Sequence, residues 1–462
     1  MSEAIRALLA GPQYHIHVRV GVQRAGTTMG AVPDVVDLTH RLVEGQLSAT
    51  MDDGARRFSV TFWAGRNGDP DGDTLQPLVG ASAYNDPSPL LWAGNALELK
   101  VAIVAAGTTP TDEDFRRWEV GRIDGVKAAD AQGRITVYGR DFLTAVLLDT
   151  KVRAPRKYGD PPETATDNVR GWLSAVVDDW TTIDTPGPLF GTQAWVPMVW
   201  SSEPLWLPGG EPPFGLNEYA QDAGPAVYEV CRTIALQAGW DYRTFPRHLG
   251  PTDEWGDPLL VPVLYDPDRT RTTPDAVIGL NEYTTIRELT VDASDVRNWI
   301  RARTGKTSTR VPIERLDAAS ITQYGPQVME LAESQMPGID SEVEVGNMLD
   351  YALADLKDPY ASHEVESLLW PYVELNDLHT YPAHPRYYDA DLTMAVVGYT
   401  HTFSRSGGRT TMQVRGKPLA AYRRWRVGAQ PPVLVSTNDP PPGAVAKEGT
   451  LWCKVDDLSW PA

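Results

Sequence analysis

Apolar and polar residues alternate along several segments of the chain, a pattern typical of strands that bury one face. The first segment has apolar residues at Tyr14, Ile16, Val18 and Val20. The next two have them at Phe58, Val60 and Phe62, and at Leu97, Leu99, Val101 and Ile103. With a hairpin described next, these segments predict an antiparallel sheet or barrel over residues 12 to 150.

Two distant stretches, residues 120–139 and 397–416, share one strand-turn-strand pattern. In each, Val-Gly opens a β-rich run, Gly-Arg marks the turn, and a glycine follows the returning strand. Each copy closes a longer β-rich segment, which predicts a duplicated β domain rather than a short tandem repeat. If three such chains associate, two similar domains per chain can form a six-part ring under threefold symmetry.

Helical spacing interrupts the strand pattern in three places. The first stripe comprises Val169, Trp172, Leu173, Val176, Val177 and Trp180. A second helix is predicted from Pro225 to Gly239, because Pro suits a first helical turn and Gly follows a last one. The third follows Ser341 and Glu344, which have capping-box spacing, and ends before Pro359. Its apolar stripe comprises Val345, Met348, Leu349, Ala352, Leu353 and Leu356.

These patterns predict a mainly β protein with α+β insertions. We expect two related antiparallel β-barrel-like domains, an inserted Trp/Pro-rich domain and a helical insertion. The predicted boundaries are residues 1–154 for the first β domain, 155–278 for the inserted domain, 279–417 for the second β domain with helix at about 312–358, and 418–462 for a proline-rich C-terminal arm.

Length and composition fit this organisation. The 462 residues favour two to four domains, and 42% hydrophobic with 22% charged residues is ordinary for a globular protein. No apolar run reaches the roughly 18 residues of a membrane-spanning helix. Because 61 acidic residues face 42 Lys and Arg, the net charge of -19 disfavours a basic nucleic-acid-binding surface. The charge serves either solubility or a surface that must not hold DNA.

Several candidate sites fail on spacing. His15 and His17 lie on the polar face of a predicted strand without a third metal ligand. The acidic loop 67–73 places Leu78 where a calcium loop needs a bidentate Glu. His363-Glu364 begins like a zinc protease helix but has Ser367 in place of the second histidine. We therefore predict no enzyme and assign no catalytic, cofactor-binding or metal-binding residue.

Two segments suggest binding. Trp195, Trp200 and Trp206 lie among prolines and either stack on sugars, dock a neighbouring protein or form local core. The C-terminal arm has a proline-stiffened linker and one short strand at 449–455, which either adds to a neighbour's sheet or packs on its own domain. The helix predicted from Pro225 to Gly239 contains Cys231, for which we expect a packing role.

Four short motifs carry a resemblance to a known family. They are Ser320-Ile321-Thr322-Gln323-Tyr324-Gly325 with the helix at 341–357, Leu369-Trp370-Pro371, Gly398-Tyr399-Thr400-His401-Thr402-Phe403, and Thr410-Thr411-Met412-Gln413-Val414-Arg415-Gly416. Together they resemble the tail hub proteins of long-tailed bacteriophages, also called baseplate hub or tail-associated proteins. The resemblance covers residues 280 to 417 best. One departure is Asn376-Asp377, where a Gly-Asp turn is expected; either pair makes a tight turn.

The resemblance implies a structural virion protein at the tail tip, made in the host cytoplasm. It implies a homotrimer whose paired β domains form a pseudo-sixfold ring between a hexameric tail tube and a threefold tip. The implied partners are the distal tail protein and tail tube above, the tape measure protein and exiting DNA inside, and other tip proteins or fibres outside. An acidic inner wall would limit DNA sticking. A glycan- or receptor-binding tail protein is the alternative, and a cell-wall hydrolase a distant third.

Overall fold

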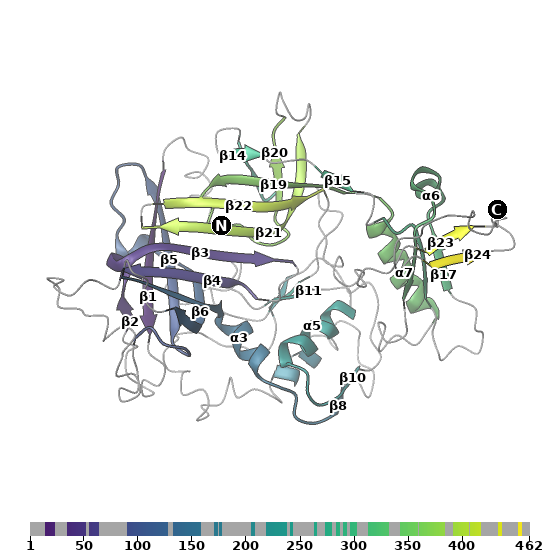
Figure 1. Ribbon diagram of the computed structural model, residues 1–462, viewed down its shortest axis with the longest axis horizontal. Coiled ribbons are helices and arrows are strands. Elements are labelled where there is room, and N and C mark those ends of the chain that lie inside the picture. Colours follow the sequence, from purple (N-terminus) through teal and green to yellow (C-terminus); the bar gives the residue numbers. More distant parts are fainter. Residues whose placement is uncertain are drawn as a thin grey trace.

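The computed structural model describes residues 14–23, 35–51, 55–63, 90–127, 133–158, 171–173, 175–177, 205–207, 219–237, 241–243, 263–265, 273–279, 283–286, 290–292, 296–302, 313–331, 342–358, 360–383, 391–405, 407–416, 433–436 and 451–454. Most of the described residues lie in β-strands, which are largely antiparallel, and a few helices accompany them (Figure 1). The predicted fold class, mainly β with α+β insertions, is confirmed.

One 14-stranded sheet dominates the fold. Its strands are β1 (Tyr14–Gln23), β2 (Val35–Asp37), β3 (Leu42–Thr50), β4 (Arg57–Trp63), β5 (Ala96–Ala105), β6 (Arg116–Lys127), β7 (Arg134–Asp141), β13 (Ala276–Val277), β14 (Tyr283–Ile286), β15 (Thr290–Asp292), β19 (Tyr360–Leu368), β20 (Leu378–Tyr381), β21 (Leu392–Ser404) and β22 (Gly407–Arg415). The strands predicted near residues 14, 58 and 97 and both predicted hairpins are confirmed.

The sheet contains the same strand order twice. In the first unit, the chain runs β3-β4-β5-β6-β7, and the spatial order is β3-β4-β7-β6-β5. In the second, β14 and β15 precede β19-β20-β21-β22, and the spatial order is β14/β15-β19-β22-β21-β20. In each unit the last strand lies beside the second strand, β7 beside β4 and β22 beside β19, which is the arrangement of a Greek key. The two hairpins that share a sequence pattern occupy corresponding positions in these five-position units.

The two units are joined edge to edge in one sheet. β21 pairs antiparallel with β3, for example Thr400 with Ser48 and Thr402 with Gln46. In Figure 1, β19, β22, β21, β3 and β4 run across the view, whereas β1, β2 and β5 run up it, so the sheet curls along its length. The domain boundaries predicted at residues 154, 278 and 417 stay predictions.

Alternation places the apolar residues of these strands on the inner side of the curl. The main buried cluster takes Val18 from β1, Val60 from β4, Leu99 from β5 and Val414 from β22. The glycines of the first hairpin make room within it. A Cβ atom at Gly121 or Gly139 would overlap the ring of Phe58, which explains why Val-Gly and a closing glycine mark this hairpin.

The inserted region contributes two small sheets and helices. Its strands are β8 (Arg156–Tyr158) with β10 (Tyr219–Gln221), and β9 (Leu205–Leu207), β11 (Asp241–Arg243) and β12 (Val263–Tyr265). The predicted second helix is α5 (Val227–Gln237), and residues 171–173 and 175–177 of the first predicted stripe are helical. Trp172, Leu173, Cys231 and Ile234 lie in one core cluster with α3 (Phe142–Asp149), so the packing role of Cys231 is confirmed.

The predicted helical insertion also contains a sheet. α6 (Ala318–Tyr324) and α7 (Glu342–Leu356) accompany β16 (Trp299–Ala302), β17 (Ile313–Leu316) and β18 (Val328–Leu331). Each of these strands has only four residues, and a run that short does not show the apolar-polar alternation by which a strand is predicted from sequence. The α7 stripe is confirmed, because Val345, Met348, Leu349 and Ala352 are fully buried. Asn376 adopts a positive φ of 67°, so the predicted turn is confirmed.

The C-terminal region differs from the single strand predicted there. β24 (Leu451–Lys454) pairs in parallel with β23 (Val433–Ser436), a segment between prolines that carries no alternating pattern. Two single-turn 3-10 helices, η1 (Thr39–Arg41) and η2 (Asp112–Asp114), complete the described elements. None of the helices in the described part of the chain combines the length and apolar character needed to span a bilayer.

Candidate functional site

The outward side of the central sheet carries polar side chains that alternate with the core residues. We use the name outer face for the outward-pointing residues of seven adjacent strands: β19, β22, β21, β3, β4, β7 and β6. Strand register aligns them in rows that cross both units. One row is Arg122, Arg140, Arg57, Ser48, Thr400, Thr411 and Glu366. The next is Gly125, Tyr138, Ser59, Gln46, Thr402, Arg409 and Leu368.

Hydroxyl and amide groups make up the middle of the outer face. On β22, β21, β3 and β4 they are Thr411, Gln413, Thr400, Thr402, Ser404, Gln46, Ser48, Thr50, Ser59 and Thr61. Among the outward residues of these four strands, Glu44 is the single carboxylate. The Thr61 and Thr136 hydroxyls lie 3.0 Å apart across β4 and β7. An acidic chain therefore presents a broad sheet face with few carboxylates.

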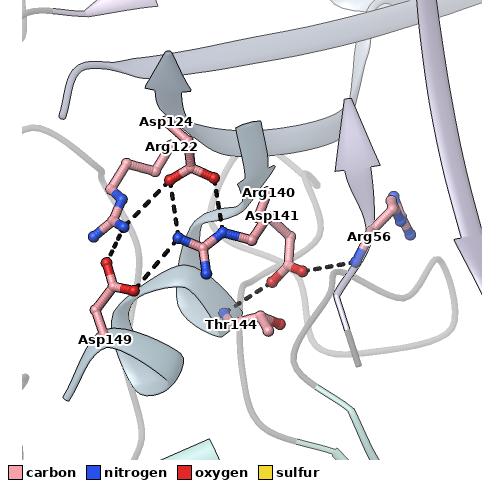
Figure 2. Close-up of polar contacts among 7 residues, drawn as sticks. All are labelled: Arg56, Arg122, Asp124, Arg140, Asp141, Thr144 and Asp149. Carbon is pink, nitrogen blue, oxygen red and sulfur yellow. Dashed lines mark hydrogen bonds and ion pairs between the residues drawn. The ribbon is translucent and has the colours of Figure 1, made fainter. Parts of the chain in front are cut away.

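Two arginines at the β6–β7 end of the outer face lie in a closed ion-pair ring (Figure 2). Arg140 donates from Nε to Oδ2 of Asp124 at 2.7 Å and from Nη2 to Oδ1 at 3.0 Å. Arg122 donates to Asp124 at 3.3 Å and also to Asp149. Arg140 lies 3.4 Å from Asp149. Because Arg122 and Arg140 are direct cross-strand partners, the two carboxylates offset repulsion between like charges.

Helix α3 brings Asp149 to the ring. Asp141 ends β7 and caps α3, because its side chain accepts from the Thr144 amide at 2.9 Å and from the Arg56 amide at 3.0 Å. Asp149 ends the helix, where the negative end of the helix dipole disfavours a carboxylate. Pairing with Arg122 and Arg140 offsets this cost and ties α3 to the hairpin.

The charges of the ring reinforce one another. Burial alone would raise the pKa of Asp149, but hydrogen bonding and charge from Arg122 and Arg140 hold that pKa below its usual range. The hydrogen bond to Asp124 raises the pKa of Arg140. Asp149 and Arg140 are therefore ionised near neutral pH, and the ring sets two carboxylates against two guanidinium groups. At the other end of the outer face, Arg409 pairs with Glu366 at 3.6 Å.

A second polar group is buried on the inner side, where the two units meet. Arg56 donates to Glu119 at 2.7 Å and to the Trp118 carbonyl at 3.1 Å, and the Arg56 and Glu119 side chains are 3% and 0% exposed. Burial raises the pKa of Glu119 to about 8, although the charge of Arg56 opposes the shift. Burial also raises the pKa of Asp141.

Aromatic rings surround this buried pair. Trp118 lies 5.2 Å from His401 and 5.1 Å from Phe403, measured between ring centroids. Nδ1 of His401 lies 2.9 Å from the Thr410 hydroxyl, and burial lowers the pKa of His401 well below its usual range. The imidazole is therefore neutral. This inner group is a packed joint between units.

The residues weighed from the sequence that the structure describes are not brought together in one site. His15 and His17 lie together on β1, with ring centroids 6.4 Å apart, as the alternation predicted. His363 lies on strand β19 rather than on a zinc-binding helix. Trp206 belongs to β9, whereas Trp195, Trp200 and loop 67–73 lie outside the described residues. Within the described ranges, no group of three or more His, Cys, Asp or Glu side chains could hold a metal ion.

Sequence reasoning missed the ion-pair ring and the buried Arg56–Glu119 pair. Asp141 and Thr144 have the spacing of a helix cap, and an acidic residue at the end of a helix, such as Asp149, calls for a cation. Those signals were available. The partners themselves depend on strand register between segments far apart in the chain.

Comparisons with known proteins agree with this architecture. No protein-family model and no curated protein sequence matches the chain. Solved structures resemble it over most of its length. A tail protein from Neisseria meningitidis MC58 matches with a TM-score of 0.50 and 13% identity, covering 87% of this chain and 96% of that protein. The 43 kDa tail protein of prophage MuSo2 from Shewanella oneidensis matches with a TM-score of 0.51 and 12% identity, covering 86% and 98%.

At these identities the likeness concerns the fold, and it spans nearly the whole of both tail proteins. The resemblance inferred from the short sequence motifs is confirmed at that level. The chain has the fold of phage tail proteins.

Proposed function

We propose that this chain is a structural protein of a phage virion that assembles as a homotrimeric hub at the distal end of the tail tube. The observation that carries the proposal is the strand order repeated in two joined units of one sheet. Three chains would supply six such units, so a threefold assembly would present a pseudo-sixfold ring. Such a ring fits a hexameric tube above and a threefold tip below.

The outer face supplies the inner wall of the ring in this proposal. It crosses both units without a break, and its short hydroxyl and amide side chains form a broad polar surface. The partners we propose are the distal tail protein and tube above, the tape measure protein and passing DNA inside, and other tip proteins or fibres outside. The proposed role is structural and needs no catalytic residue.

Mass measurement of the full chain tests the assembly. Light scattering over a range of concentrations should give three times the chain mass, and class averages in the electron microscope should show a ring with six similar parts. Because assembly depends on concentration and on bound partners, gold-labelled antibody against the chain should also mark the tail tip of purified virions. A monomer at every concentration, together with virions that carry no label at the tip, would rule out the hub.

A further inference from the structure

The outer face carries arginines although the chain as a whole is acidic. Arg122, Arg140 and Arg57 are neighbours in one row on three adjacent strands, and Arg409 lies on β22 at the other end. A row of arginines on an open sheet would ordinarily favour phosphate binding. The net charge of -19 belongs to the whole chain and does not by itself prevent local binding on this face.

Helix α3 marks where the open face begins. Val120 and Arg122 are two positions apart on β6, so both side chains leave the same side of the strand. Val120 is buried in the core cluster with Phe142 and Val146 of α3. Arg122 lies one step beyond, half-buried, where the helix ends at Asp149. The ring therefore lies at the margin between the helix-covered and the open part of the sheet.

Arg122, Arg140 and Arg409 are each neutralised by carboxylates beside them. Two carboxylates match Arg122 and Arg140, and Asp124 occupies two N–H groups of Arg140 in a bidentate contact. Glu366 faces Arg409 from the neighbouring strand β19. A guanidinium held in this way has fewer N–H groups to offer a phosphate, and its charge is already compensated. The hydroxyl and amide groups between these pairs carry no charge.

We propose that duplex DNA passes along the outer face without being retained, and that Asp124, Asp149 and Glu366 serve this function by neutralising Arg122, Arg140 and Arg409 in place. The inference rests on the proposed function, in which this face surrounds the channel. Retention of DNA depends on cations that displace condensed counterions from phosphates. The arginines are kept because they hold α3 to the hairpin, and the paired carboxylates remove the affinity for DNA that they would otherwise bring.

Removal of the two ring carboxylates tests the proposal as a gain of binding. The variant D124N/D149N keeps side-chain shape and leaves Arg122 and Arg140 uncompensated. The probe is a fluorescein-labelled duplex of random sequence, followed by anisotropy between low and moderate salt. We expect about tenfold tighter binding than that of the wild type at low salt, and a log-log salt slope steeper by about 2, one unit for each freed arginine.

The matched control is D112N/D350N. It changes the net charge by the same amount and also frees two arginines, because Asp112 pairs with Arg19 and Asp350 with Arg315, both away from the outer face. DNA binding by the control should stay at the wild-type level. A third variant, D124N/D149N with R122Q and R140Q added, should lose the gained binding.

Two results would overturn the inference: D124N/D149N that melts like the wild type yet binds DNA no more tightly, or D112N/D350N that gains equal affinity. Should D124N/D149N fail to fold, E366Q takes its place, because it frees Arg409 at the other end of the face and should steepen the salt slope by about 1. A folded E366Q protein whose salt slope equals that of the wild type would also overturn the inference. The assay does not depend on assembly, so the mass and antibody-labelling results that would rule out the hub leave the result of this DNA-binding test unchanged.

Discussion

Trp118 on β6 lies against Phe403 on β21, with 5.1 Å between the ring centroids. β6 and β21 hold the same position in the two units of the sheet, so this contact joins equivalent strands across the inside of the curl. Trp118 is 1% exposed and among the largest fully buried side chains of the described chain. The joint between units is therefore a small aromatic core with the Arg56–Glu119 pair beside it.

Substitution W118A should strongly destabilise the fold. Truncation of a buried Trp typically costs about 3–5 kcal/mol through lost burial and the cavity left behind. Denaturant unfolding followed by circular dichroism measures the difference. The control is W92A, because Trp92 is 45% exposed and its loss should change the free energy of unfolding by less than about 0.5 kcal/mol. Equal effects of the two substitutions would contradict the buried joint.

The pH dependence of stability should report on Glu119. Its folded pKa of about 8 lies above the ordinary value of 4.5, so the folded state binds the proton more tightly than the unfolded state. The stabilisation is complete below about pH 4.5 and is lost as pH rises toward about 8. Denaturant midpoints of the wild type should therefore fall across this window, and E119Q should lack that component. If the denaturant midpoints of the wild type and E119Q changed with pH in the same way, the raised pKa of Glu119 would be excluded.

Glycine at position 139 should resist enlargement. A Cβ atom there would meet the Arg122 carbonyl oxygen and lie 2.7 Å from the Phe58 ring, so backbone and ring would both have to move. We expect G139A to lower the free energy of unfolding by about 1–3 kcal/mol, as overpacked cores do. The matched control is G171A, since that helical position has nothing within 4 Å of an added Cβ and Ala favours helix. A G139A protein as stable as G171A would refute the close approach.

Cys231 should be chemically inert in the native protein. Burial raises the pKa of its thiol to about 12, so almost none of it is thiolate at neutral pH. In a C453S background, the remaining thiol should react with a coloured disulfide reagent only after denaturant unfolds the chain. Rapid modification under native conditions, with the fold intact, would show that this part of α5 is open to solvent.

Alternation and helical spacing predicted the parts of the fold that depend on local sequence. Strands β1, β4 and β5, both hairpins and α7 bury one face each, and their periodicities are visible without any knowledge of neighbours. The four-residue strands β16, β17 and β18 are too short to show a period. The joining of both units in one sheet depends on the pairing of β21 with β3, which local patterns do not encode.

The outer face could be predicted only in part. Polar positions on each strand followed from alternation, but the rows that align Arg122 with Arg140 and Arg57 depend on which strands are neighbours. The same holds for Glu119, whose partner Arg56 lies 63 positions away. The acidic inner wall stays a prediction, whereas the outward residues of β22, β21, β3 and β4 are mostly hydroxyls and amides.

The pairing of β21 with β3 also bears on how the protein is made. Arg405, just beyond β21, bonds to the His40 carbonyl 365 positions earlier in the chain. During translation, β3 leaves the ribosome long before β21, its partner strand, has been made. The edge of β3 that later pairs with β21 therefore stays unpaired, and open to other nascent chains, for most of synthesis. A polypeptide that terminates before Leu392 would keep that edge, and we expect such fragments to aggregate or require a chaperone.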